Sequence, residues 1–147
     1  MNKIKVEFIK LNKDAITPTF GTEFSAGADL YSAEDDVVIK PNETKFIGTG
    51  IATAIPEGTV GLIYARSGLA CKKGLAPANK VGVIDSDYRG EIKVALHNHG
   101  TVEQIVLKGE RVAQMVITPY YTAEYVEVAS LSQTERGEGG FGSTGRK

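Results

Sequence analysis

The stretch "KVGVIDSDYRGEIKVAL", residues 80–96, places two strand-like segments on either side of a polar turn. The apolar run "VGVI" leads into Asp85-Ser86-Asp87-Tyr88-Arg89-Gly90, and strand character resumes at Ile92. Two such runs around a polar turn that contains glycine are typical of a β-hairpin. The stretch therefore predicts a hairpin with two carboxylates near its bend.

Strand patterns continue in both directions from this stretch. Alternating or densely apolar segments predict strands over residues 3–9, 45–55, 59–65, 91–99, 102–107, 111–117 and 121–128. Turn signals such as Pro56-Glu57-Gly58 and Lys108-Gly109 separate these segments. One short helix is predicted over residues 67–76, ended by Gly74 and then Pro77. Many short strands with regular turns and one helix indicate an all-β sandwich or barrel.

Length and charge limit the class of protein. The chain has 147 residues and a net charge of −1, which suits one globular domain and provides no broad basic field for nucleic acid. The N-terminus alternates apolar and charged residues, unlike a signal peptide, and no stretch approaches the length of a membrane span. We therefore expect a cytoplasmic protein without nucleic-acid or membrane partners. The single cysteine, Cys71, permits no internal disulfide, and one cysteine with two histidines argues against a zinc site.

Apolar periodicity stops near Ser130, before the glycine-rich stretch "RGEGGFGSTG" at residues 136–145. Because glycine loses more backbone entropy on ordering than other residues, we expect a β domain over 1–131 and a flexible segment over 132–147. Glycine amides can form a concave nest for an anion, and Arg136 adds a planar cationic fork. Composition alone leaves two interpretations open, a disordered polar tail or a lid that a bound anion orders.

Three further clusters, and Asp85 of the stretch 80–96, carry polar side chains in strand or turn contexts. Asp29 lies among small residues in "SAGADLYSA" (25–33), and Gln114 lies in the strand-like "GERVAQM" (109–115). Arg66-Ser67-Gly68 stand at the start of the predicted helix, where free N–H groups suit an anion. Asp85, if ionised, can accept a proton from an attacking water. Each cluster alone also fits a plainer interpretation, such as a solvated turn or an outward-facing strand residue.

Five stretches together resemble the trimeric dUTPases (deoxyuridine 5′-triphosphate nucleotidohydrolases): "AGADLYS", "ARSGLA", "GVIDSDYRGEI", "GERVAQM" and "RGEGGFGSTG". They follow the family's order and cover nearly the whole chain. The resemblance implies an antiparallel, jelly-roll-like β-barrel with one short helix and a flexible C-terminal arm. It also implies a homotrimer with three active sites, each built from all three chains. The implied reaction is Mg²⁺-dependent hydrolysis of dUTP to dUMP and pyrophosphate, which keeps uracil out of DNA and supplies dUMP for dTMP synthesis.

The resemblance assigns roles to residues by matching position. Asp85 orients and activates the water that attacks the α-phosphorus, and Tyr88 packs on deoxyribose and rejects a 2′-hydroxyl. Asn79 helps to read uracil together with backbone groups of the predicted hairpin, which includes Val83, in a pocket too tight for a 5-methyl group. Asp29 holds Mg²⁺ through bound waters.

The remaining substrate-binding residues implied by the resemblance contact phosphate or, in the case of Phe141, stack on uracil: Arg66, Ser67, Gly68, Gln114, Arg136, Phe141, Gly142, Ser143 and Thr144. Arg89, Glu91 and Arg111 are assigned to scaffolding. The glycine-rich tail is then a lid that a neighbouring subunit supplies and that can open to release pyrophosphate.

Two alternatives on the same fold stay open. A dCTP deaminase would need a group that activates water toward cytosine C4, and we find no further glutamate placed for it. A non-catalytic nucleotide-sensing protein would bind dUTP tightly without turnover, although intact Asp85 and Arg136 argue against it. Release of pyrophosphate from dUTP, or of ammonia from dCTP, distinguishes the three functions.

Overall fold

The structure of the protein, a computed structural model, describes residues 3–140. In this part of the chain one helix and eleven strands form, in the order β1 Glu7–Lys10, β2 Thr19–Phe20, β3 Ala28–Tyr31, β4 Val37–Ile39, β5 Thr44–Ala54, β6 Thr59–Tyr64, α1 Ser67–Lys73, β7 Leu75–Pro77, β8 Gly82–Ile84, β9 Glu91–Asn98, β10 Gln104–Val106 and β11 Arg111–Pro119. Among the described residues no helix is both long enough and apolar enough to cross a membrane.

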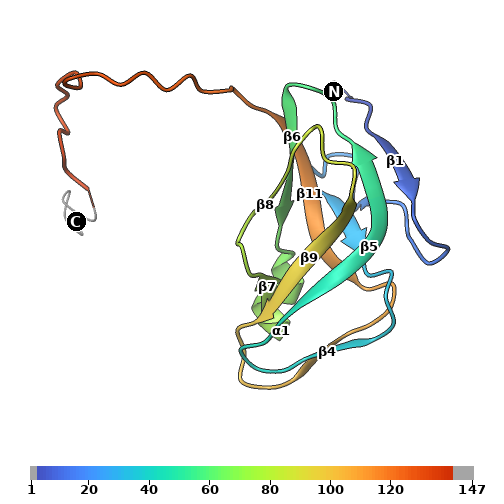
Figure 1. Ribbon diagram of the computed structural model, residues 1–147. Coiled ribbons are helices and arrows are strands. Elements are labelled where there is room, and N and C mark those ends of the chain that lie inside the picture. The colour runs from blue at the N-terminus through green and yellow to red at the C-terminus, as the bar shows by residue number, and fades with distance from the viewer. Residues whose placement is uncertain (1–2, 141–147) are drawn as a thin grey trace.

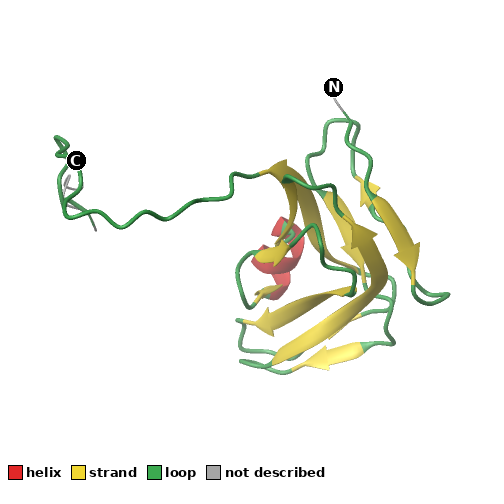
Figure 2. Cartoon of the chain, turned by 45° about the horizontal axis from the view of Figure 1, so that its top comes forward, coloured by secondary structure: helices red, strands yellow, loops and turns green. Residues whose placement is uncertain are grey.

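Three antiparallel sheets organise these strands (Figure 1). One sheet has the order β1-β5-β9-β7, a second has the order β2-β3-β11-β6-β8, and β10 pairs with β4 in a small third sheet. Figure 2 shows the strands wrapping around a common interior with the helix at one side. The predicted fold class is confirmed: the chain is mainly antiparallel β with one short helix.

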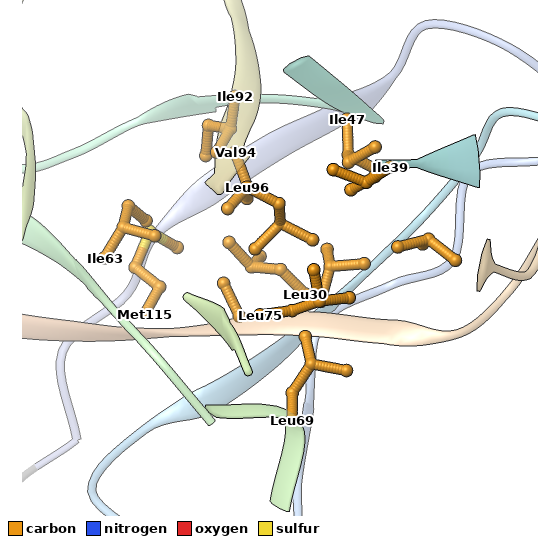
Figure 3. Close-up of a cluster of buried hydrophobic side chains, with 13 residues drawn as sticks. Leu30, Ile39, Ile47, Ile63, Leu69, Leu75, Ile92, Val94, Leu96 and Met115 are labelled. Carbon is orange, nitrogen blue, oxygen red and sulfur yellow. The ribbon is translucent and has the colours of Figure 1, made fainter. Parts of the chain in front are cut away.

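A single hydrophobic core lies between the sheets (Figure 3). Both large sheets contribute to it, for example Ile47 on β5 and Ile92 on β9 from one side, and Leu30 on β3 and Ile63 on β6 from the other. Alternate residues along β9 are buried, as expected for a strand with one face on a core. Leu69 of α1 closes the core at one end, which fixes the helix against the sheets.

The predicted hairpin over residues 80–96 is wrong, although its strands and turn exist. β8 pairs with β6, whereas β9 pairs with β5 on one side and with β7 on the other. Because both edges of β9 are already occupied, β8 has no place beside it and lies in the other sheet. Residues 85–90 therefore form an arch that crosses from one sheet to the other.

The predicted strand over residues 121–128 is also absent. β11 ends at Pro119, and the chain then runs away from the body without secondary structure (Figure 1). Tyr121 and Tyr125 are 101% and 95% exposed, so this strand-like pattern buries nothing within its own chain. A strand needs a neighbour for its backbone hydrogen bonds, and no strand of the described residues lies alongside this one.

The other predicted boundaries shift by a few residues. The helix ends at Lys73 because Gly74 takes left-handed backbone (φ 66°) and donates to the carbonyls of Leu69 and Ala70. The next three residues then pair with β9 as strand β7. The first strand covers Glu7–Lys10 rather than 3–9, where it pairs with residues 51–54 of β5.

Candidate active site

The arch over residues 85–90 holds its shape through its own hydrogen bonds. The Tyr88 amide donates to the Asp85 carbonyl at 3.1 Å, and the Tyr88 hydroxyl donates to the Glu91 carbonyl at 3.0 Å. The Arg89 guanidinium folds back and donates to the carbonyls of Ser86 and Tyr88 at 2.6 and 2.9 Å. Among residues 3–140 no hydrogen bond or ion pair engages the carboxylate of Asp85, so this exposed group is available to water or substrate.

An open recess of about 640 Å³ lies against the arch. The residues that line it come from the arch and from strands β5, β8 and β9: Phe46, Val83, Ile84, Asp85, Tyr88, Glu91 and Lys93. Ile84 packs on the hydrophobic core and Ile92 is fully buried, so the core anchors both ends of the arch. The predicted catalytic Asp85 and sugar-contacting Tyr88 thus face one cavity.

A smaller pocket of about 140 Å³ shares Phe46, Val83, Ile84 and Lys93 with the recess and adds Asn79 and Gly82 among its lining residues. A tight turn places Asn79, since the Lys80 amide donates to the Pro77 carbonyl and the Val81 amide to the Asn79 carbonyl. Val83 is 61% exposed, so its side chain is not part of the core. The predicted base-reading residues therefore gather beside Asp85 and Tyr88.

The predicted phosphate-binding residues form a second group, on β3 and β11 and after β6 in the five-stranded sheet that also contains β8. Asp29 on β3 pairs in register with Gln114 on β11, which pairs in turn with Tyr64 on β6. Arg66 and Ser67 follow β6 directly and begin α1. The three adjacent strands bring these side chains to one place.

Two arginines hold Asp29, which is 8% exposed. Its Oδ1 accepts from Nε of Arg66 at 2.7 Å, and its Oδ2 accepts from Nη1 of Arg111 at 3.2 Å. A mostly buried carboxylate requires such pairing, because desolvation of an isolated charge is costly. Asp29 therefore fixes the orientation of Arg66, whose remaining guanidinium N–H groups stay available for a ligand.

Gln114 braces the segment that leads into the helix. Its Nε2 donates to the Ala65 carbonyl at 2.9 Å. A Cβ on Gly27 would lie 2.6 Å from Oε1 of Gln114, so this side chain packs closely against the small residues before Asp29. Ser67 and Gly68 are exposed in the first turn of α1, beyond Arg66.

Residues 132–140 lie apart from both groups in this chain (Figure 1). Arg136 donates from Nε to the Gly139 carbonyl at 2.8 Å, within a local turn, and makes no described contact with the recess or with Asp29. Phe141, Gly142, Ser143 and Thr144 lie outside the described residues.

Phe46 and Lys93 line both the recess and the smaller pocket, although the sequence does not predict them as site residues. Both lie on the outward face of predicted strands, next to the buried Ile47 and Ile92. The period-two alternation of β5 is the sequence signal that could have identified Phe46, because it places the aromatic ring on the exposed face of the sheet. Phe46 is 69% exposed, which is unusual for so large an apolar side chain.

Comparison with known proteins gives a consistent result. The family model for dUTPase matches residues 13–145. A deoxyuridine 5′-triphosphate nucleotidohydrolase from Nautilia profundicola is 53% identical over 143 residues, which span 97% of this chain and 100% of the relative. Another from Hydrogenobaculum sp. is 52% identical over 138 residues, 94% of this chain and 96% of the relative.

Solved structures show the same similarity. The dUTPase of Staphylococcus bacteriophage 80alpha with dUpNHpp is 33% identical, with a TM-score of 0.90 over 97% of this chain and 99% of that one. A mutant dUTPase from phage phi11 of S. aureus, described for its coordination of a structural Mg(II) ion, is 27% identical with a TM-score of 0.81 over 88% and 100% of the two chains. Because the family model and these relatives match nearly the whole length, the chain belongs to the dUTPase family.

Proposed function

We propose that this chain hydrolyses dUTP to dUMP and pyrophosphate, as its relatives' names state for them. The observation that carries the proposal is the arch over 85–90, which presents Asp85 and Tyr88 at one recess, with Asn79 in the adjoining smaller pocket. No residue of the described range 3–140 pairs with the Asp85 carboxylate. The bound dUpNHpp in a structural relative supports a nucleoside triphosphate as the ligand.

In the proposed reaction Asp85 is the general base. Its carboxylate orients a water molecule and accepts a proton as the water oxygen bonds to the α-phosphorus. The bond from that phosphorus to the bridging oxygen breaks, and pyrophosphate leaves with its electron pair. The exposure of Asp85 supports this role, because none of the described residues occupies its carboxylate and a water molecule can reach it.

Residues around the recess and the smaller pocket select the base and the sugar. Asn79 and the backbone of β8 supply donors and acceptors for uracil, and the small volume of their pocket disfavours a 5-methyl group. Tyr88 packs on the deoxyribose, where a 2′-hydroxyl would collide with its ring. The Tyr88 ring can exclude a 2′-hydroxyl sterically only if it stays in place. The hydrogen bond from its hydroxyl to the Glu91 carbonyl holds it there.

The residues that bind the triphosphate are Arg66, Ser67, Gly68 and Gln114. Asp29 holds Mg²⁺ through water molecules bound to the ion. A carboxylate has about four acceptor positions, and the two arginines occupy one on each oxygen, so positions remain for metal-bound water. The described residues include no group of three or more His, Cys, Asp or Glu that could cage a metal directly. This donor set fits Mg²⁺, which keeps its waters and binds through one or two carboxylates plus phosphates. When bound, the ion would neutralise charge on the triphosphate.

A homotrimer completes the proposed site. No residue of the phosphate group lines the recess or the smaller pocket of its own chain, although β8 shares a sheet with β3, β11 and β6. The exposed segment after β11 leads the tail away from its own chain, as expected if it reaches a neighbour (Figure 1). Residues 132–147 then act as a lid on another subunit's site, with Arg136 on the γ-phosphate, Phe141 on uracil, and Gly142, Ser143 and Thr144 on phosphate.

A nucleotide panel tests the function. With Mg²⁺, pyrophosphate release is expected from dUTP and not from UTP, dTTP or dCTP. Asp85→Asn should still bind dUTP and lose about two orders of magnitude or more in turnover. Tight dUTP binding without any turnover in the unmodified protein would favour a sensor, and ammonia from dCTP would favour a deaminase.

Subunit mixing tests the shared site. Asp85→Asn protein and protein that lacks residues 136–147 are each expected to be nearly inactive. After subunit exchange, mixed trimers contain sites with an intact Asp85 from one chain and an intact tail from another, so activity should partly return. Verified exchange without recovery would contradict a site built from several chains.

A further inference from the structure

Strand β5 is irregular next to the arch. Gly48 pairs with Lys93 and Ala52 pairs with Glu91, so β5 advances four residues where β9 advances two. Gly50 within this bulge has left-handed backbone, with φ 64°. A bulge breaks the regular ladder and leaves backbone N–H groups that need other acceptors.

Side-chain oxygens accept from these amides. The Gly48 amide donates to Oε1 of Glu34 at 3.0 Å, and the Gly50 amide donates to Oε1 of Glu91 at 2.9 Å. The hydroxyl of Thr49, which is 1% exposed, donates to the Ile92 carbonyl at 2.7 Å. The bulge is therefore bonded to the first two residues of β9.

Glu91 connects this bulge to Tyr88 through two different groups. Its carbonyl accepts the Tyr88 hydroxyl at 3.0 Å, while its carboxylate accepts the Gly50 amide. The Glu91 side chain is 24% exposed and lies at the wall of the recess. Nζ of Lys93 lies 3.4 Å from the second carboxylate oxygen, so this ion pair leaves the bond to Gly50 in place.

We propose that Glu91 is a positioning residue for substrate selection: it ties the end of the arch to the β5 bulge and so keeps the Tyr88 ring fixed at the recess. The proposal rests on the sugar-selecting role proposed for Tyr88. Glu91 itself touches no reacting atom. If its side-chain bond is lost, the Glu91 carbonyl is less well fixed, the Tyr88 ring gains freedom, and a ribonucleotide is tolerated more readily.

The test compares the ratio of kcat/KM for dUTP to that for UTP among three variants. Glu91→Ala is expected to lower this ratio by about three- to tenfold, the effect of roughly one hydrogen bond, with KM for dUTP raised more than kcat is lowered. Glu91→Gln should restore the ratio, because its amide oxygen can accept from Gly50. Glu34→Ala is the matched control, since it removes the same kind of bond from the same bulge without touching the arch.

Glu91→Ala and Glu34→Ala should lower the melting temperature to a similar extent, and only Glu91→Ala should change the nucleotide ratio. An unchanged ratio in Glu91→Ala overturns the proposal and leaves a purely structural bond. If Glu91→Ala does not fold, Glu91→Asp replaces it, because the shorter aspartate side chain cannot reach the Gly50 amide. An unchanged ratio in Glu91→Asp would also overturn the proposal.

Tyr88→Ala, measured alongside, separates this proposal from the function it rests on. If Tyr88→Ala keeps the preference for dUTP over UTP, the sugar-selecting role of Tyr88 is wrong, and the role of Glu91 falls with it. If Tyr88→Ala loses that preference while Glu91→Ala keeps it, only the positioning role is overturned.

Discussion

Gly90 is the residue at which a single methyl group should disturb the proposed site most directly. A Cβ at this position would lie 2.5 Å from Cζ of Tyr88 and 2.9 Å from Cε2. Carbon atoms that are not bonded to each other prefer a separation of about 3.5 to 4.0 Å, so the ring has to retreat by about 1 Å in Gly90→Ala. The backbone of Gly90 is not left-handed, so alanine itself fits the chain and the strain falls on the ring.

The expected result is a loss of activity with little loss of stability. A displacement of about 1 Å at a positioning group can cost about 10²-fold in rate, so kcat/KM for dUTP should fall by about that factor. Tyr88 is 43% exposed, so its ring can move toward solvent. The main interaction lost by this movement is the hydrogen bond from its hydroxyl to the Glu91 carbonyl. That bond is worth about 1 kcal/mol, or about 3 °C in melting temperature for a chain of this size.

Pyrophosphate release under varied dUTP concentration measures the first quantity, and thermal unfolding followed by circular dichroism measures the second. Gly21→Ala is a suitable control, because its Cβ would lie 3.6 Å from the Ser25 hydroxyl, an ordinary contact. If Gly90→Ala kept kcat/KM within about threefold of the unmodified protein, a fixed Tyr88 ring would not be needed for catalysis.

Three further predictions concern the rest of the molecule. Asp29→Asn weakens two charged hydrogen bonds, so it should lower the free energy of unfolding by about 1–3 kcal/mol and reduce kcat/KM more than tenfold. Urea titration and kinetics measure these two quantities. Asp35→Asn is the control and should change neither quantity, because this carboxylate is 96% exposed. Deleting residues 136–147 should cripple turnover yet leave the proposed trimer intact in sedimentation, and full activity after deletion would contradict the lid. A hydrogen bond from the Lys40 amide and, to a lesser extent, one from the Lys45 side chain hold the pKa of the Glu43 carboxyl below its ordinary value. The stabilising contribution of Glu43 is therefore present above its unfolded-state pKa and is lost as the pH falls through its folded-state pKa. Glu43→Gln should therefore be less stable than the unmodified protein near neutral pH and equally stable in strong acid, which urea unfolding at several pH values can measure.

Much of the site could be predicted from the sequence because its residues are adjacent in the chain or match an ordered set of stretches. Asp85 and Tyr88 lie three residues apart in one turn, so any turn there brings them together. The bond from Tyr88 to Glu91 and the two arginines on Asp29 could not be predicted in the same way. Arg66 and Arg111 are far from Asp29 in sequence and meet it only because β3, β11 and the end of β6 are neighbours.

The sequence by itself determined the β class, the places where strands turn, the end of the helix at Gly74, and the family. These follow from local periodicity, from backbone preferences and from a set of ordered residues, all of which are present in the linear chain. Only the tertiary structure decided that β8 leaves β9 for β6, that Phe46 and Lys93 border the recess, and that residues 121–128 pair with no strand of the described residues. The physical reason is that alternation reports which face of a strand is buried, whereas the choice of neighbour depends on which strand edges remain free once the whole core has formed.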